Sequence, residues 1–162
     1  MIPGNLMLVC GWGLGLFAGT GLAVPSSELE TRDEPLTAHL TFRAASSEET
    51  YTMAVLADGN PVKTGHETLA VGLVDAPDYL AQTFCNFQMS GEASISSKIA
   101  SDNVTQQVVI DPPQPILSVS CRGFCVGIYG ACYGSDGQYV GPCCNGVCIA
   151  TRCRPWNIGH QG

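Results

Sequence analysis

The sequence predicts an all-β protein in which a small β-sandwich-like domain is followed by a disulfide-rich module. Three observations support this prediction. The 162 residues include 19 Gly and 10 Pro but only 13% charged residues, so turns are abundant and long amphipathic helices lack material. Short stretches in the middle of the chain alternate apolar and polar residues at strand spacing. Seven of the nine cysteines follow residue 120.

The first 23 residues have the pattern of a signal peptide. No charged side chain occurs from Leu6 to Val24, and small residues at Gly21-Leu22-Ala23 suit a signal peptidase. A membrane anchor is the alternative, which five glycines between residues 11 and 21 disfavour. Cleavage removes Cys10 and leaves eight cysteines, an even number for four bridges. We therefore expect a secreted, extracellular protein without stable membrane insertion after signal removal.

Charge divides the remaining chain. Residues 24–119 contain four basic and thirteen acidic side chains, a net charge of −9, whereas residues 120–162 contain three arginines and one aspartate, a net charge of +2. The acidic residues 24–35 indicate a flexible arm, with a propeptide as the rival interpretation. We expect a signal peptide over 1–23, the arm over 24–35, a β-rich domain over 36–120 and a cysteine-rich module over 121–162.

The strands of the β-rich domain are predicted from the alternation of apolar and polar residues. The stretch from Leu36 to Phe42 is the clearest strand, with apolar residues at every second position. A second strand from Tyr51 to Leu56 ends in a tight turn at Asp58-Gly59, where glycine supplies the positive φ. Further strands are expected at 69–74, 82–89, 106–110 and 116–120, at the regular spacing of a sandwich.

One cysteine, Cys85, lies inside this domain. A domain of about 90 residues buries only about 60% of its unfolded surface and gains from a cross-link. The nearest candidate is Cys121, directly after the last expected strand. We expect these two to pair, which by chain entropy stabilises the fold by on the order of 4 kcal/mol.

The six remaining cysteines are separated by six, ten, zero, three and four residues; they are Cys125, Cys132, Cys143, Cys144, Cys148 and Cys153. Adjacent cysteines rarely bond to each other because the ring they close is strained, so Cys143 and Cys144 have different partners. Asn145-Gly146 predicts a hairpin turn, with the returning strand from Val147 to Thr151.

This spacing resembles that of the inhibitor cystine knot family, the knottins, and Cys143-Cys144-Asn145-Gly146-Val147-Cys148 is the segment most like them. The resemblance implies a knottin-like module with three bridges, Cys125 to Cys144, Cys132 to Cys148 and Cys143 to Cys153. It says nothing about residues 24–120. Another disulfide-rich fold remains open, because spacing alone does not determine the pairing.

The arrangement as a whole is similar to the small secreted cysteine-rich proteins of filamentous fungi, many of which are treated as candidate effectors. The similar segments are residues 139–144 and 152–156, which follow a leader and a β-rich region. This resemblance implies a secreted protein that acts by binding.

We expect no catalytic residues and no enzyme activity, since His39, His66 and His160 lie in separate parts of the chain without a nucleophile motif. Neither a metal site nor a cofactor is expected, because oxidised cysteines do not ligate zinc. The expected contact surface consists of large side chains of the cysteine-rich module, with packing against the β domain as the alternative; they are Val126, Ile128, Tyr129, Tyr133, Tyr139, Arg152, Arg154 and Trp156. Asn103 begins an Asn-Val-Thr triplet and is a candidate glycan acceptor.

These observations favour a monomeric, effector-like or toxin-like binding protein whose partner is an extracellular protein or glycan and not a nucleic acid. The alternative is a knottin-type protease inhibitor acting through the loop from Val126 to Ala131. A structural wall or coat protein is a third hypothesis.

Overall fold

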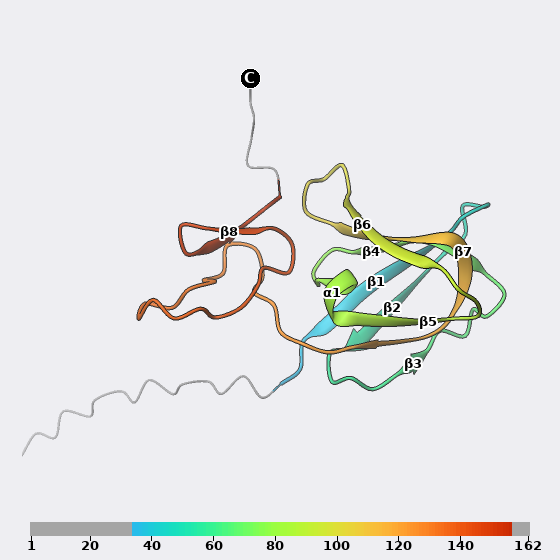
Figure 1. The fold of residues 1–162 in the computed structure, drawn as a ribbon, viewed down its shortest axis with the longest axis horizontal. Helices are drawn as coiled ribbons and strands as arrows, with labels where there is room; N and C mark the ends of the chain where they lie inside the picture. The colour runs from blue at the N-terminus through green and yellow to red at the C-terminus, as the bar shows by residue number, and fades with distance from the viewer. Residues whose placement is uncertain (1–33, 157–162) are drawn as a thin grey trace, which may run out of the picture. The chain divides into compact units, whose positions relative to one another are not determined.

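A computed structural model describes residues 34–156, and within this range the chain is almost entirely β (Figure 1). The expected signal peptide and nearly all of the expected arm, residues 1–33, lie outside the described residues. The β-rich and cysteine-rich parts belong to one compact unit.

The β-rich part contains seven strands and one short helix: β1 (Thr37–Ala44), β2 (Thr50–Leu56), β3 (Val62–Lys63), β4 (Ala70–Ala76), α1 (Ala81–Phe84), β5 (Cys85–Met89), β6 (Ser94–Ile99) and β7 (Gln106–Cys121). The hydrogen-bonded order is β2-β1-β4-β7-β3, and β5 and β6 also pair with β7. All the pairings are antiparallel. The all-β, sandwich-like prediction is therefore confirmed, in the form of a nearly closed sheet.

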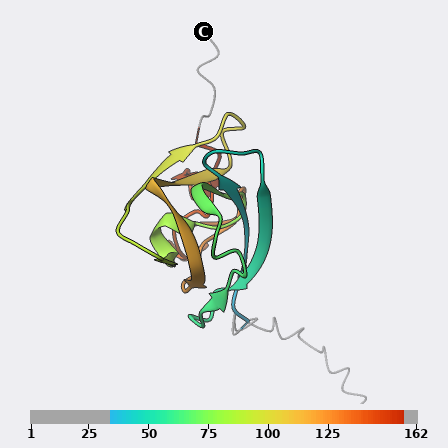
Figure 2. The ribbon, with the colours of Figure 1, turned by 90° about the vertical axis from the view of Figure 1, so that its right-hand side faces the viewer.

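Strand β7 joins the two layers of this sheet. Its first part, residues 106–110, pairs with β4 and β6, and its last part, residues 116–121, pairs with β3 and β5. The orange strand bends between the layers in Figure 2. We expected two separate strands here, because three prolines lie between them. The register with β4 shifts between Val71 and Leu73, so Pro112 and Pro113 lie at an irregularity of the ladder, where a missing N–H is tolerated, whereas Pro115 lies opposite Ala70.

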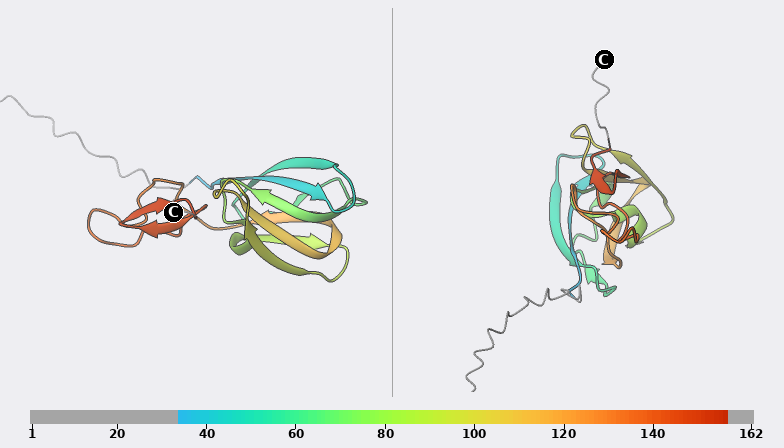
Figure 3. Two further views of the ribbon diagram at one scale, coloured as in Figure 1. Left: turned by 90° about the horizontal axis from the view of Figure 1, so that it is seen from above. Right: turned by 90° about the vertical axis from the view of Figure 1, so that its left-hand side faces the viewer.

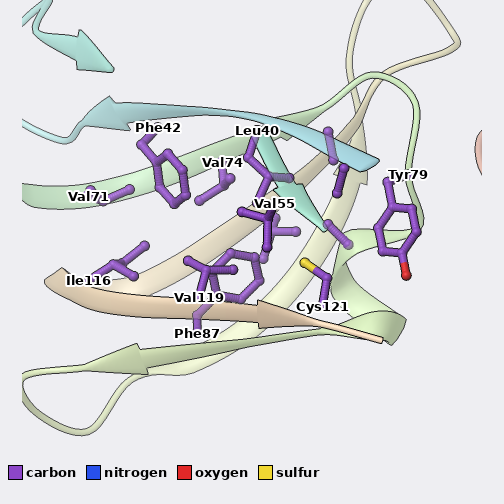
Figure 4. Close-up of a cluster of buried hydrophobic side chains, with 14 of the residues drawn as sticks. Leu40, Phe42, Val55, Val71, Val74, Tyr79, Phe87, Ile116, Val119 and Cys121 are labelled. Atoms are coloured by element: carbon purple, nitrogen blue, oxygen red, sulfur yellow. The ribbon is translucent and has the colours of Figure 1, made fainter. Parts of the chain in front are cut away.

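The core lies between the two layers. In β1 the residues at alternate positions, Ala38, Leu40 and Phe42, are at most 1% exposed. Figure 4 shows Leu40, Phe42, Val55 and Val74 on one side and Phe87, Ile116 and Val119 on the other. Burial of each such Leu, Val, Ile or Phe side chain contributes about 1.5–3 kcal/mol. The hydrophobic alternation that predicted the strands is therefore also what holds the layers together.

Two expectations for this part need correction. The stretch 82–89 was expected to be a strand throughout, but its beginning belongs to the single turn of α1 and only Cys85–Met89 is extended. Strand β6 was not expected, because five of its six residues are exposed and the sequence shows no apolar alternation. The tight turn at Asp58-Gly59 is confirmed, with φ +87° at Gly59.

The cysteine-rich part contains a two-stranded hairpin of β8 (Val147–Ile149) and β9 (Arg152–Arg154), drawn as two red arrows in Figure 3. The expected turn at Asn145-Gly146 is wrong: the turn is made by Ala150 and Thr151, both with positive φ. Asn145 is instead buried, and its amide donates a hydrogen bond to the carbonyl of Pro77. At Gly146 an added Cβ would clash with the carbonyl oxygen of Arg154, so this residue is a point of close backbone approach.

Candidate functional site

Four disulfides cross-link the described chain. Cys85 bonds Cys121, its directly opposite neighbour in β5 and β7. The other three bridges join Cys125 to Cys144, Cys132 to Cys148 and Cys143 to Cys153. All four pairs are the expected ones, and the last three connect first with fourth, second with fifth and third with sixth cysteine. Each of these three bridges therefore spans at least two other cysteines in the sequence.

The β8–β9 hairpin has one face toward these bridges and one face away from them. Cys148 lies opposite Cys153 in the register, and directly opposite residues share a face of an antiparallel pair. The neighbours on either side point the other way, because side chains alternate along a strand. Val147 lies opposite Arg154, and Ile149 lies opposite Arg152. These four side chains therefore share the face that the cystines leave free.

Tyr129 joins this face through two contacts. The guanidinium carbon of Arg154 lies 5.5 Å from the centre of the Tyr129 ring, at cation–π distance. Arg152 donates a hydrogen bond of 2.9 Å from Nη1 to the backbone oxygen of Tyr129. We call this set of five residues, Tyr129, Val147, Ile149, Arg152 and Arg154, the outer face. The exposed fractions of Tyr129, Ile149 and Val147 are 60%, 46% and 36%.

Two more expected contact residues form a tyrosine pair beside the hairpin turn. The rings of Tyr133 and Tyr139 meet edge to face with centres 5.3 Å apart, and their exposed fractions are 40% and 57%. The backbone N–H of Tyr133 donates to the oxygen of Thr151, in the turn between β8 and β9. The tyrosine pair therefore adjoins the end of the hairpin that carries Ile149 and Arg152.

Three expected contact residues do not belong to this surface. Val126 is only 5% exposed and packs against the cystines and Phe124, which makes it part of the module's small core. Ile128 is half-buried. Trp156 is also partly buried, and its backbone N–H donates to the carbonyl of Asn103, so it packs against the loop between β6 and β7. The alternative interpretation, packing against the β domain, fits Trp156, whereas Val126 packs inside the module itself.

Two residues of the outer face, Val147 and Ile149, were missed in the sequence. The information was present: each of the two short segments Val147-Cys148-Ile149 and Arg152-Cys153-Arg154 has a cysteine at its centre. A cysteine that faces a bridge on one side of a strand sends both neighbours to the other side. The turn that the sequence predicts at Asn145-Gly146 gives a different pairing of the strands, and this pairing hides the pattern.

The loop expected to act in a protease inhibitor has its backbone engaged inside the module. Tyr129 has φ +66°, and its N–H donates to the oxygen of Cys153. The N–H of Cys153 in turn donates to the oxygen of Gly130. A segment that adds to the edge of another protein as a strand needs extended residues with free backbone groups. Residues 126–131 therefore lack the features that would favour this alternative.

The loop between β4 and α1 contacts the cysteine-rich module. The hydroxyl of Tyr79, a fully buried residue, donates a 3.0 Å hydrogen bond to the carbonyl of Gly123. In the same loop, the backbone carbonyl of Pro77 accepts the hydrogen bond from the Asn145 amide. The bridge Cys125–Cys144 packs in the same core cluster as Leu40 and Val119. Burial raises the pKa of the Tyr79 phenol, so this hydroxyl stays a hydrogen-bond donor at ordinary pH.

The candidate glycan acceptor Asn103 lies in the loop between β6 and β7, in a left-handed conformation with φ +58°. Asp102 holds this loop: its carboxylate accepts bonds from the backbone N–H groups of Val104 and Thr105 and from the Thr105 hydroxyl. These bonds hold the pKa of the Asp102 carboxyl below its usual value. Asn103 is half-exposed in this turn.

Among residues 34–156, the hydrogen bond between a histidine and a hydroxyl side chain uses the backbone N–H of His66, which donates to the Thr64 hydroxyl, and not an imidazole ring. His39 contacts Asp78 at 2.5 Å on the surface, and His66 stacks on Tyr51 with ring centres 3.9 Å apart. His160 lies outside the described residues. The sulfurs of Cys132, Cys143 and Cys153 lie within 4.8 Å of one another, but each is bonded in a disulfide and offers no thiolate to a metal.

Comparison of the chain with models of known protein families, with curated proteins and with solved structures gave no match. Among residues 34–156 the structure contains no helix of the length and apolar character needed to cross a membrane.

Proposed function

We propose that this chain is a secreted, non-enzymatic binding protein in which a knottin-like module presents the outer face to an extracellular protein or glycan. The observation that carries the proposal is that Cys148 and Cys153 share one face of the β8–β9 hairpin, whereas Val147, Ile149, Arg152 and Arg154 share the other. Large apolar side chains and arginines on a small exposed surface are typical of binding sites. Because the cross-links hold this surface in one shape, little conformational entropy is lost on binding.

Secretion is supported by the bridges themselves. Structural disulfides persist in oxidising compartments and are rare in the reducing cytosol. The apolar segment at residues 6–24 would direct export as part of a signal peptide that is then removed. An effector-like role, of the kind found among the small secreted cysteine-rich proteins of fungi, fits a protein that acts by binding outside the cell.

The experiment that tests this function offers the oxidised protein to a defined panel of extracellular protein domains and immobilised glycans. Two variants accompany the wild type. In the first, Arg152→Ala and Arg154→Ala remove the two positive charges of the outer face. In the second, Lys63→Ala and Lys98→Ala remove two exposed positive charges from the β-rich part, which makes it a matched control.

We expect the wild type and the lysine control to bind the same panel members, and the arginine variant to bind them at least tenfold more weakly. Equal binding of all three proteins would show that the outer face is not the site. Turnover of a panel member by the purified wild type would contradict the non-enzymatic assignment.

We also propose that Asn103 carries a glycan when the protein is exported through a eukaryotic secretory pathway. Its position in an exposed turn between two strands is compatible with attachment. Intact-mass measurement before and after glycosidase treatment tests this, with Asn103→Gln as the unmodified reference.

A further inference from the structure

The outer face combines an aliphatic strand with a basic one. Strand β8 contributes Val147 and Ile149, and β9 contributes Arg154 and Arg152 directly opposite them. Val147 and Ile149 are both exposed. Valine and isoleucine side chains are more often buried. A partner that covers this face must therefore accommodate both apolar surface and two positive charges.

Both arginines are positioned before any partner arrives. The guanidinium of Arg154 lies against the Tyr129 ring, and Arg152 is tied to the Tyr129 backbone oxygen. Neither makes an ion pair with a carboxylate among residues 34–156, where the ion pairs are His39 with Asp78 and Arg43 with Asp75. A guanidinium held in place by a ring or a carbonyl keeps donors free for a carboxylate and loses little freedom in binding it.

The charge of the rest of the protein narrows the class of partner. The whole chain has a net charge of −7. Attachment to anionic lipid by charge takes clusters of about 4–8 basic residues, and nucleic-acid binding takes many phosphate contacts. Two arginines on an acidic protein supply neither. These two classes of partner are therefore disfavoured.

The aliphatic residues distinguish a protein from a polysaccharide. An acidic glycan could pair with Arg152 and Arg154, but its hydroxyl-rich surface offers less apolar area to Val147 and Ile149 than a protein surface does. A protein surface can bury both residues against apolar side chains while its acidic side chains meet the arginines. Arginine and tyrosine are also enriched among the residues that contribute most to protein–protein binding.

We infer that the partner of the outer face is a protein surface on which an apolar patch is bordered by Asp or Glu side chains. This inference rests on the proposed function and deepens it by naming the chemistry of the partner. Ile149 and Val147 pack on the apolar patch, and Arg152 and Arg154 pair with the carboxylates. Tyr129 contributes its exposed ring at the margin, where it also holds Arg154.

Selection from a displayed library of random peptides tests the inference, because such a library presupposes no particular partner. The oxidised protein that remains after signal removal is immobilised and used for selection, and the enriched peptides are synthesised for affinity measurement. We expect enrichment of peptides that combine Leu, Ile, Val or an aromatic residue with Asp or Glu two or three positions away. Their binding should weaken with rising salt concentration, because exposed charge pairs are screened.

Variants assign the binding to the outer face. Arg152→Ala with Arg154→Ala, and separately Ile149→Ser, should each weaken the binding of the selected peptides at least tenfold. Lys63→Ala with Lys98→Ala should change the affinity less than twofold. A thermal melt of each variant shows whether it retains the fold, and Arg152→Lys provides a charge-retaining variant for the case in which the double variant does not fold.

The other outcomes separate the inference from the proposed function. Selected peptides without acidic residues, or without apolar ones, would overturn the inference. Binding of polygalacturonate oligomers or of phosphatidylserine vesicles at the outer face, in place of peptides, would overturn it while leaving a binding function. Self-association through this face in sedimentation would do the same. Failure of every probe to bind would count against both.

Discussion

Cys148 and Cys153 lie directly opposite each other in β8 and β9, yet each is bonded to a different cysteine outside the hairpin. The bridge of Cys148 runs to Cys132 and the bridge of Cys153 runs to Cys143. Each strand of the hairpin is thus anchored separately to another segment of the module. This arrangement keeps both cystines on one side and leaves Val147, Ile149, Arg152 and Arg154 on the other.

The first prediction concerns Gly146, where the backbone has φ +144° and an added Cβ would clash with the Arg154 oxygen. Gly146→Ala should prevent β9 from docking, so that oxidative refolding yields mixed disulfide isomers in place of one species. The matched control is Gly137→Ala, at φ +79° with open space around the added Cβ. This change should lower the free energy of unfolding by only about 1 kcal/mol, because it disfavours the backbone conformation without causing a clash. Chromatography of the refolded material checks both, and a single native species from Gly146→Ala would contradict the close approach.

The second prediction concerns the hairpin turn, where two residues with side chains have positive φ, 48° at Ala150 and 67° at Thr151. A left-handed conformation costs about 1–2 kcal/mol for most residues with a Cβ, and Asn-Gly is favoured in two-residue hairpin turns. Ala150→Asn with Thr151→Gly should therefore raise the free energy of unfolding by about 1 kcal/mol. Denaturant titration measures this difference. A variant less stable than the wild type would show that the turn has another conformation.

A strand can be predicted from the sequence where one of its faces is buried and the other is exposed, because apolar and polar residues then alternate. Leu40 and Phe42 face one core, so their alternation predicted β1 correctly. Strand β6 is exposed on both sides and leaves no pattern to detect. The three prolines of β7 predicted a break because a proline cannot donate to a ladder, but the irregular register opposite Gly72 removes that requirement for Pro112 and Pro113, and Pro115 lies opposite Ala70.

The site shows a similar division. Cysteine spacing, together with the knottin resemblance, led to all four bridges, since cross-links are specified by few residues. The hairpin turn was misplaced because Asn-Gly is a strong local turn pattern, whereas here Asn145 is used to reach Pro77 across the molecule. A contact between residues far apart in the sequence, such as this one or that of Trp156 with Asn103, has no local pattern that predicts it.

The third prediction concerns the junction between the two parts of the chain. Tyr79→Phe removes the hydroxyl that donates to Gly123 while retaining the buried ring. We expect a loss of about 1 kcal/mol in unfolding free energy, because the carbonyl of Gly123 loses its partner. Tyr129→Phe, at a ring that is 60% exposed, is the matched control and should change stability by less than about 0.5 kcal/mol. Equal effects of the two changes would argue against this hydrogen bond.

The fourth prediction concerns pH and Asp102. Hydrogen bonds from Thr105 and Val104 lower the pKa of this carboxyl in the folded protein. The stabilisation is therefore present above the ordinary pKa of an aspartate, 3.8, and is lost as the pH falls through the lower folded value. Asp102→Asn should be less stable than the wild type at neutral pH, and the difference should shrink as the solution is acidified. A difference that grows on acidification would contradict the assigned bonds.

The measurement that tests the account most directly is disulfide mapping of the oxidised protein without reduction. Trypsin cleaves after Arg152, chymotrypsin cleaves after Tyr129, Tyr133 and Tyr139, and hydroxylamine cleaves between Asn145 and Gly146, so Cys125, Cys132, Cys148 and Cys153 fall on separate peptides. Mass spectrometry then identifies which peptides remain joined. The structure predicts that the Cys153 peptide is joined to the one containing Cys143, and the Cys148 peptide to the one containing Cys132. A bond between Cys148 and Cys153 would tie the hairpin only to itself, and the outer face would lose the anchors on which its proposed binding role depends.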